Sequence, residues 1–268
     1  MLHKSKLENV TVGADPEVFV ANHTGTITSA IGNVGGSKDF PRPVTDGGVQ
    51  EDNVLAEFNI NPASNKIEFL YNMNSVMSSL KNILENKDLQ PVIIASHMFD
   101  KGELESYGPM AMEFGCSAEW NAWSGREMPR PQGSKVNLRT AGGHVHVGYD
   151  DPNKADSIAL VKMLDFVLGL PSIEIDPDNQ RRKLYGKAGS MRYKPYGVEY
   201  RSLSNFWLSS DDLMSWVYDT TLWATNNLGM LPEFLELVDN KTLNKVINKS
   251  DKQSARAIID ELGIQRIA

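Results

Sequence analysis

The sequence predicts a single α+β domain, in which strands and helices follow one another along the chain. Apolar and polar residues alternate in short segments such as 10–20, VTVGADPEVFV, and this pattern is typical of strands. Apolar residues recur at helical spacing in 63–87 and 153–170. The 268 residues contain no internal repeat, low-complexity tract or obvious linker. We therefore expect one domain over residues 1–268.

The other strands are predicted in chain order. Residues 24–30 are a candidate hairpin partner of the first strand. Residues 31–53 are rich in Gly, Pro, Asn and Asp, and we expect a long functional loop there. Residues 115–139 have no clear period and are expected to be irregular. Further strands are predicted at 54–62, 91–99, 138–149 and 198–208.

Two more helices are predicted in the second half of the chain. Residues 209–227 open with Ser and Asp, which are good capping residues, and continue as a helix. The polar segment 231–268 is expected to be a peripheral helical extension. The earlier helix at 153–170 is expected to end at Pro171, because proline disrupts a helix interior.

Composition and charge exclude several classes of protein. A net charge of −7 argues against a global nucleic-acid footprint, although it leaves a local basic patch possible. The single cysteine, Cys116, cannot form a disulfide within the chain and is expected to be a packed residue rather than a nucleophile. No secretory signal or membrane span is evident, so we expect a cytoplasmic protein.

Polar side chains recur at a spacing of two in four predicted strands, and alternate residues of a strand face the same side. One such pair is explained by a solvated sheet face, but four pairs of these residue types favour a ligand site. Glycines flank the histidine pair in GGHVHVG, where they allow close approach of another backbone or a ligand. The pairs are Asp15 and Glu17, Glu57 and Asn59, His144 and His146, and Glu199 and Arg201.

If these strands share one sheet face, they form a pocket of carboxylates, imidazoles and an arginine. Carboxylate oxygens suit Mg²⁺, which is normally accompanied by phosphate groups. The basic stretch 179–197 supplies arginines, whose guanidinium groups match phosphate oxygens. Arg192 and Arg201 are the preferred phosphate contacts because they flank the strand of Glu199. Lys38, in the turn GGSKD, contacts a phosphate or carboxylate or belongs to an ordinary turn.

Four motifs within residues 10–208 together resemble the phage carboxylate–amine ligase family, the type-2 amidoligases, distant relatives of glutamine synthetase and glutamate–cysteine ligase. The motifs are GADPE, DNVLAEFN, GGHVHVG and YGKAGSMRYKPYGVEYRSLSN. The resemblance implies a curved, mainly antiparallel sheet whose concave face binds ATP and Mg²⁺, with helices behind it. It also implies a ligase that joins a carboxylate to an amine through an acyl phosphate, in the host cytoplasm if a phage encodes it.

The resemblance also implies roles for individual residues. The expected catalytic residues are Glu57, Arg192 and Arg201. The expected metal ligands are Asp15, Glu17, Asp52, Glu57, His144 and Glu199. The expected ATP contacts are Lys38, His146, Arg182, Arg192 and Arg201. The extra N-terminal domain of glutamine synthetase has no counterpart here, and the acidic spacing over 51–57 is shorter than in that enzyme.

Other interpretations remain open from the sequence. A zinc hydrolase would use His144 and His146 as ligands, a phosphotransferase would share the nucleotide site, and an inactive binding protein would keep only the fold. Trp120 and Trp123 either line the acceptor pocket or pin their segment to the core, and we favour the core. The expected partners are small-molecule or peptide carboxylates and amines, with no membrane partner, no strong nucleic-acid signal and an oligomer possible.

Overall fold

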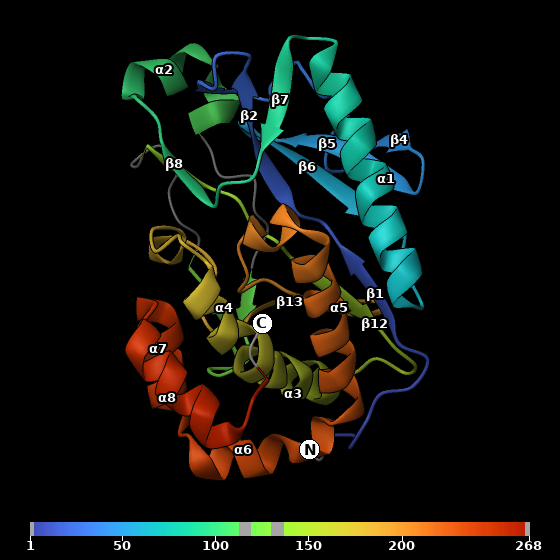
Figure 1. Ribbon diagram of the computed structural model, residues 1–268, viewed down its shortest axis with the longest axis vertical. Helices are drawn as coiled ribbons and strands as arrows, with labels where there is room; N and C mark the ends of the chain where they lie inside the picture. Colours follow the sequence, from blue (N-terminus) through green and yellow to red (C-terminus); the bar gives the residue numbers. More distant parts are fainter. Residues whose placement is uncertain (1–2, 113–118, 130–136, 266–268) are drawn as a thin grey trace.

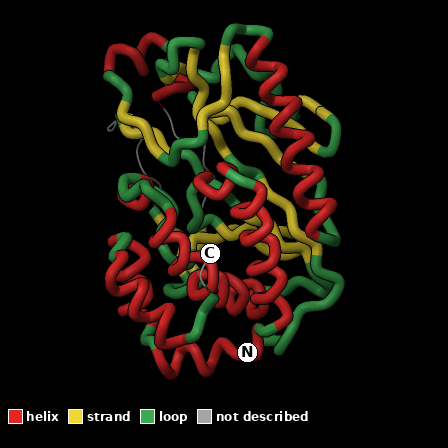
Figure 2. Tube along the Cα trace, viewed as in Figure 1, coloured by secondary structure: helices red, strands yellow, loops and turns green. Residues whose placement is uncertain are grey.

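The computed structural model describes residues 3–112, 119–129 and 137–265, and Figures 1 and 2 show their arrangement. Within these residues the strands form two six-stranded sheets and one two-stranded sheet, and every strand pair is antiparallel. The predicted α+β class, with mainly antiparallel sheets and helices behind them, is confirmed. Cys116 lies outside the described residues.

The first sheet, which we call the histidine sheet, has the order β1 (Thr11–Ala14), β12 (Val145–Gly148), β14 (Gly197–Tyr200), β13 (Ser190–Lys194), β9 (Glu119–Asn121) and β10 (Arg126–Met128). Its register places His146 opposite Glu199, and Glu199 opposite Arg192. These three polar side chains therefore lie in one row across three strands. The alternate residues, among them Val145 and Val198, are fully buried.

The second sheet, which we call the acidic sheet, has the order β3 (Ile27–Thr28), β2 (Glu17–Asn22), β6 (Leu55–Ile60), β5 (Gly47–Asp52) and β4 (Arg42–Val44), and β7 (Leu89–Val92) also pairs with β2. Its register places Glu17 opposite Glu57, and Glu57 opposite Gln50. The helix α1 (Lys66–Glu85) packs across this sheet (Figure 1). The two-stranded sheet pairs β8 (Ser96–Met98) with β11 (Leu138–Thr140).

The chain passes from the histidine sheet to the acidic sheet at Asp15 and Pro16. The prediction of one strand over 10–20 is therefore wrong, because β1 and β2 belong to different sheets. Proline has no N–H to donate to a ladder, which explains why strand pairing is interrupted at this position. The flanking amides still find partners, since the Asp15 N–H faces the His144 carbonyl at 3.4 Å and the Glu17 N–H faces the Gly142 carbonyl at 2.9 Å.

Several predicted boundaries also differ. The expected loop at 31–53 contains the hairpin β4–β5, whose turn has Asp46 at a positive φ of 65°. The expected strand at 91–99 is divided between β7 and β8, and the described part of 115–139 contains the hairpin β9–β10. The expected strand at 198–208 ends with β14 at Tyr200, and a 3-10 helix, η5 (Asn205–Ser209), follows.

The helices of the second half cover the histidine sheet. The helix α3 (Lys154–Leu164) continues through a π-helical segment, η3 (Asp165–Gly169), into α4 (Leu170–Ile175). The predicted end at Pro171 is therefore wrong, since this proline occupies the first turn of α4, where a missing N–H is tolerated.

The remaining helices are α2 (Lys101–Ser106), α5 (Asp211–Asn226), α6 (Leu231–Leu237), α7 (Asn240–Lys249) and α8 (Lys252–Leu262). The tail predicted to be helical thus forms α6, α7 and α8, and α8 packs against α4. In residues 3–112, 119–129 and 137–265, no helix is both long and apolar enough to span a membrane.

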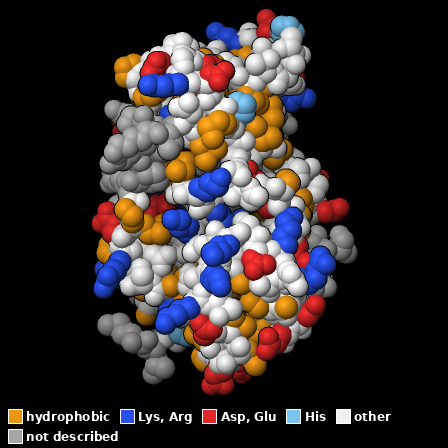
Figure 3. All heavy atoms as spheres, turned by 90° about the vertical axis from the view of Figure 1, so that its left-hand side faces the viewer, with side chains coloured by type: hydrophobic (Ala, Val, Ile, Leu, Met, Phe, Trp, Pro, Cys, Tyr) orange, Lys and Arg blue, Asp and Glu red, His pale blue; other side chains and the backbone are white. Residues whose placement is uncertain are grey.

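The face at the left of Figure 1 is turned toward the viewer in Figure 3. Lys and Arg side chains are spread over the middle of this face, below a group of hydrophobic side chains in its upper part. The chain therefore presents local positive charge despite its net charge of −7.

Candidate functional site

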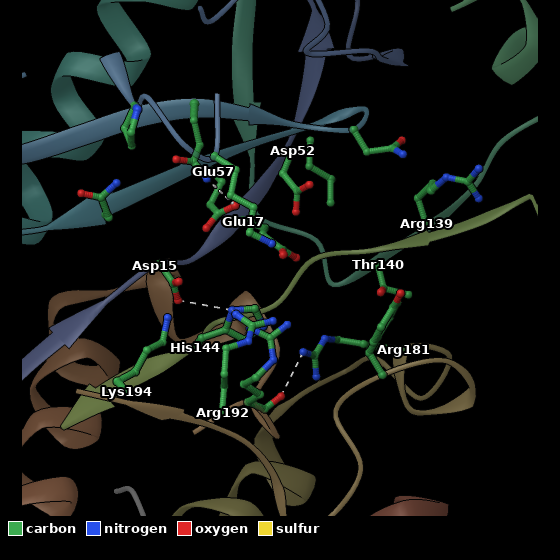
Figure 4. Close-up of a pocket in the computed structure, with 18 residues that line it drawn as sticks. Asp15, Glu17, Asp52, Glu57, Arg139, Thr140, His144, Arg181, Arg192 and Lys194 are labelled. Carbon is green, nitrogen blue, oxygen red and sulfur yellow. Dashed lines mark hydrogen bonds and ion pairs between the residues drawn. The ribbon is translucent and has the colours of Figure 1, made fainter. Parts of the chain in front are cut away.

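A pocket of about 280 Å³ lies where the two sheets meet, and most of the predicted site residues line it (Figure 4). The expected pocket therefore exists, but the four polar pairs do not share one sheet face. They approach each other from two sheets. The predicted residues that line the pocket are Asp15, Glu17, Lys38, Asp52, Glu57, Asn59, His144, Arg192 and Arg201.

The wall formed by the acidic sheet carries three carboxylates, Glu17 from β2, Asp52 from β5 and Glu57 from β6, which we call the acidic trio. One oxygen of each lies within 4.8 Å of one oxygen of the others. Neutral donors hold two members, because Gly142 N–H donates to Glu17 Oε2 at 2.6 Å and Gln50 Nε2 donates to Glu57 Oε2 at 2.9 Å. The trio is thus a cluster of oxygen ligands at the spacing of a metal site.

Crowding and burial make it costly to ionise the whole trio. Burial and the neighbouring Asp52 raise the pKa of Glu17 to about 7. Burial, together with Asp15, Asp52 and Glu17, raises the pKa of Glu57 well above its usual range. Burial also raises the pKa of Asp52, although Lys38 opposes the shift. A bound divalent cation would relieve this repulsion, so the trio fits such an ion.

Both histidines face Asp15 at the junction of the sheets. Asp15 Oδ1 lies 2.8 Å from His146 Nε2 and 3.3 Å from His144 Nδ1. Burial alone would raise the pKa of Asp15, but the two imidazoles hold it well below its usual range. The other ring nitrogen of His146 is hydrogen-bonded to the Tyr196 hydroxyl. Asp15 is therefore held as an anion beside both imidazoles.

His144 is neutral at pH 7. Burial and the adjacent Arg201 lower the pKa of its imidazole to about 4. Since a guanidinium can only donate, the 3.2 Å contact from Arg201 Nη1 makes His144 Nδ1 the acceptor. The predicted role of His144 as a metal ligand stays a prediction.

Glu199, on the histidine sheet, is surrounded by three cations. Arg192 Nη1 lies 3.1 Å from Glu199 Oε2, Lys194 Nζ lies 2.9 Å from the same oxygen, and Arg201 contacts Oε1. Burial would raise the pKa of Glu199, but Arg201 together with His146 and His144 lowers it. Glu119 also pairs with Arg201 Nε at 2.6 Å. The wall below the acidic trio therefore carries positive charge.

Glu199 also completes a second possible ligand group with Asp15 and His146, since one atom of each lies within 4.8 Å of the others. The cations around Glu199 already compensate its charge, so this group fits a metal less well than the acidic trio does.

The two adjacent glycines of GGHVHVG have no room for a side chain, which confirms the close approach that the sequence predicted. A Cβ on Gly142 would lie 2.2 Å from His144 Nε2, and a Cβ on Gly143 would lie 2.3 Å from the Ser204 carbonyl oxygen. Real Cβ atoms do not approach so closely, so any side chain here would displace His144 or the wall of the pocket.

Arg182 lies away from the pocket, contrary to the predicted ATP contact. Its guanidinium is buried, and it donates to the Ser172 and Ser250 hydroxyls at 3.3 Å each. The preceding residue, Arg181, lines the pocket instead, with its guanidinium bonded to the carbonyls of Ser202 and Arg201 at 3.1 and 3.2 Å. Burial lowers the pKa of Arg181 to about 10, so it stays charged at pH 7.

Sequence reasoning also missed other lining residues, among them Gln50, Arg139, Tyr185 and Lys194. Lys194 follows Arg192 at a spacing of two on β13, so the strand pattern used for the other pairs could have found it. Arg139 lies in the short buried strand β11, where no pattern marks it.

The two tryptophans pack on the core, which was the favoured interpretation. Trp123 Nε1 donates to the buried Asp165 at 2.6 Å, and its ring contacts Phe166 edge to face. Trp120 packs against Tyr193, with ring centroids 6.0 Å apart. Neither tryptophan lines the pocket.

Comparison with known proteins finds a family similarity in the second half of the chain. Residues 132–262 match the model of the family described as phage phiEco32-like COOH.NH2 ligase type 2. The resemblance predicted from the sequence is confirmed. The match spans just under half of the chain. It contains β12, β13 and β14, which carry His146, Arg192 and Glu199, whereas the acidic trio precedes it. It supports a carboxylate–amine ligase, the class that the motifs implied.

Two solved structures also resemble the chain, described as "GmaS/ADP complex-Conformation 1" and "Apo GmaS without ligand". Each is 11% identical to this chain, with TM-scores of 0.37 and 0.38. The alignments cover 96% and 95% of this chain, and 71% and 69% of those chains. At such TM-scores the similarity carries no argument about activity. No curated protein matches the chain at a significant level.

Proposed function

We propose that this protein is an ATP- and Mg²⁺-dependent ligase that joins a carboxylate to an amine through an acyl-phosphate intermediate. The observation that carries the proposal is the opposition of two charged walls in one pocket (Figure 4). Three crowded carboxylates face a group of guanidinium and ammonium groups, of which those of Arg181 and Arg201 are buried. Phosphoryl transfer needs these two elements, because catalysis rests on positioning and on neutralising the charge of the phosphates.

The acidic trio would hold Mg²⁺, since all its donors are hard oxygens and their mutual repulsion calls for a cation. When bound, Mg²⁺ would supply positive charge to neutralise phosphate oxygens. Asp15 is held in its ionised form beside the trio and adds a fourth carboxylate to the same pocket.

The cations of the histidine sheet would hold the phosphates. Arg192 and Lys194 share the carboxylate of Glu199 with Arg201, which also pairs with Glu119, so three positive charges meet two negative charges there. The excess of charge suits polyanions such as the nucleotide phosphates. Arg181 adds a further buried cation on the same wall, which binds either a phosphate or the substrate carboxylate.

The reaction follows in two steps. An oxygen of the substrate carboxylate attacks the γ-phosphorus of ATP, and ADP leaves with the electrons of the broken P–O bond. The amine nitrogen then attacks the acyl carbon and expels phosphate. The amine arrives as an ammonium and must first lose a proton. A carboxylate of the pocket is the expected acceptor.

The zinc hydrolase interpretation fits less well. It requires both imidazoles to face one metal ion, whereas each possible metal group among the described residues contains at most one histidine. His144 Nδ1 instead accepts from Arg201. A phosphotransferase shares every feature of the pocket, and only the second step distinguishes it from a ligase.

Calorimetric titration with a non-hydrolysable ATP analogue tests the proposal, first with Mg²⁺ and then with EDTA. We expect binding that requires Mg²⁺ and that weakens at least about tenfold in Arg192→Gln, since a charged hydrogen bond contributes about 1.5–3 kcal/mol. Arg126→Gln, an exposed change on β10 of the same sheet, should leave the affinity unchanged.

Equal affinity in both buffers and in both variants would contradict the proposed site. If binding is confirmed, carboxylate and amine pairs are screened for ADP release. ADP release that requires the amine supports the ligase, whereas phosphorylation of a substrate without any amine would support the phosphotransferase.

A further inference from the structure

A second cavity, of about 370 Å³, lies beside the start of α5 and the end of α4 and shares no lining residue with the pocket between the sheets. The connection from β7 to β8, the segment after α4 and the helix η5 enclose it. We call it the η5 cavity. Nothing in the ligase chemistry uses it.

The walls of the η5 cavity are mainly apolar. They are formed by Ile93, Ile94, Ile175, Phe206 and Leu213. Such a lining suits the hydrocarbon part of a small ligand, since pockets of this kind combine an apolar wall with a few polar groups that fix orientation.

Two carboxylates give the η5 cavity a negative charge. Asp176 accepts from the Ser204 hydroxyl at 2.8 Å and from the Asp178 N–H at 2.9 Å. Asp178 accepts from the Arg181 N–H at 2.8 Å and from the Ser96 hydroxyl. These donors are two hydroxyls and two backbone N–H groups, and none of them is an ionised side-chain group. Neither carboxylate forms an ion pair with another described residue, although the buried guanidinium of Arg182 is near enough to oppose the rise in pKa that burial causes in Asp176.

Asn205 adds an unused acceptor. The residue lines the cavity and is completely buried, and its Nδ2 donates to the Glu17 carbonyl at 2.8 Å. Its Oδ1 has no hydrogen-bond partner in the part of the chain that the structure describes. A buried amide oxygen without a donor is costly, so a ligand that donates here gains affinity.

We infer that the η5 cavity binds a small primary amine with an apolar chain. The two carboxylates favour a cation, the Asn205 oxygen requires a donor, and the apolar wall accepts a hydrocarbon chain. A carboxylic acid or a phosphate would be repelled by Asp176 and Asp178. A neutral alcohol would satisfy Asn205 but would leave a net negative charge, since two carboxylates share the single buried guanidinium of Arg182.

The η5 cavity is linked to the catalytic pocket through its own lining residues. Asn205 holds the backbone of Glu17, a member of the acidic trio, and Asp178 holds the backbone of Arg181. β8, which contains Ser96, pairs with β11 at Thr140, another residue of the pocket wall. Occupancy of the η5 cavity therefore stiffens three supports of the catalytic pocket. The binding itself does not depend on the proposed ligase activity.

Ligand-detected NMR titration with phenethylamine as the probe tests the inference, beside 2-phenylethanol and 3-phenylpropionate of matched shape. Leu213→Trp fills the cavity without touching the catalytic pocket, and Leu237→Trp, at an exposed leucine of α6, is the matched control. We expect the amine to bind at least about tenfold more tightly than the alcohol or the acid, a difference of about 1.4 kcal/mol. Leu213→Trp should abolish this binding, and Leu237→Trp should preserve it.

Three results would overturn the inference. The first is no amine binding at about 10 mM, a concentration at which even weak contacts give a signal. The second is equal binding of the amine and the alcohol. The third is amine binding that persists in Leu213→Trp. Persistent binding that is displaced by Mg²⁺ and the ATP analogue would place the amine in the catalytic pocket instead. Because nucleotide binding is measured separately, failure of this inference leaves the proposed function untouched.

Discussion

The buried carboxylate of Asp165 should make the stability of the protein depend on pH. It lies at the start of the π-helical segment and accepts four hydrogen bonds. Trp123 Nε1 and the Gly189 N–H donate to Oδ2 at 2.6 Å each, and the hydroxyls of Tyr200 and Ser202 donate to Oδ1 at 2.8 and 3.2 Å. Asp165 thereby ties the helices behind the histidine sheet to β14 and to the turn before β13.

The expected magnitude follows from the pKa. Burial raises the pKa of Asp165 from 3.8 to about 6, although its four hydrogen bonds oppose the shift. Two pKa units correspond to about 3 kcal/mol. Because the folded pKa is the higher one, this stability is present below pH 4 and is lost as the pH rises through 6. About 1 kcal/mol of the loss falls between pH 5 and pH 7.5.

Asp165→Asn removes the titration but keeps one oxygen for the two N–H donors, while its amide group can donate to the two hydroxyls. Urea unfolding of both proteins at pH 5 and pH 7.5 measures the effect. The free energy of unfolding of the wild type, relative to the variant, should be about 1 kcal/mol greater at pH 5 than at pH 7.5. Asp39→Asn, at an exposed aspartate, should show no such change. A difference that is constant with pH, or that grows toward pH 7.5, would refute the reasoning.

Three further predictions concern the pocket. Gly142→Ala should abolish ADP release and keep the fold, because the new Cβ must displace the His144 imidazole. The control Gly102→Ala should stay active, because a Cβ there meets nothing within 4 Å. Arg181→Met should weaken binding of the ATP analogue or of the carboxylate at least about tenfold, while Arg182→Met should mainly lower the melting temperature. Mg²⁺ should raise the melting temperature less at pH 6 than at pH 8, because the Glu17 carboxyl of the acidic trio has a pKa of about 7 and must ionise to bind the ion. Scanning calorimetry with and without Mg²⁺ at both pH values measures the two shifts in melting temperature.

Local sequence pattern predicted the strands that carry the site better than it predicted their arrangement. The spacing of two placed His144 beside His146, and Glu199 beside Arg201, because that spacing is a local property of a strand. It could not show that Asp15 and Glu17 belong to different sheets. That separation depends on Pro16 and on the amide contacts to Gly142 and His144, which are far away in the sequence.

The hairpin β4–β5 was missed for a related reason. Its residues are rich in Gly and Pro, and such composition predicts a loop. Gly47 nonetheless lies in a strand. Only glycine fits at this position, because a Cβ would lie 2.0 Å from the Asn59 carbonyl oxygen. Asp52 reaches the pocket only because this hairpin pairs with β6. Close packing between strands thus decides a placement that local propensity cannot reveal.

The placement of Arg181 rather than Arg182 in the pocket also depends on tertiary contacts. Both arginines lie in the short 3-10 helix η4 (Arg181–Lys183), so their side chains point in different directions. Asp178 fixes which one faces the pocket, because its carboxylate accepts the Arg181 N–H at 2.8 Å. From the sequence alone, two adjacent arginines in a basic stretch are equivalent.

The pocket owes its polarity to the register of the two sheets. The row Glu17, Glu57 and Gln50 crosses the acidic sheet, and the row His146, Glu199 and Arg192 crosses the histidine sheet. A slip of one residue in either register would turn that row away from the pocket. The sheets are joined in the chain by the short link at Pro16, and Asn205 holds the Glu17 backbone from the other side. The distance between carboxylates and phosphate-binding cations is therefore set by a few contacts at this junction, and changes there should affect catalysis before they affect folding.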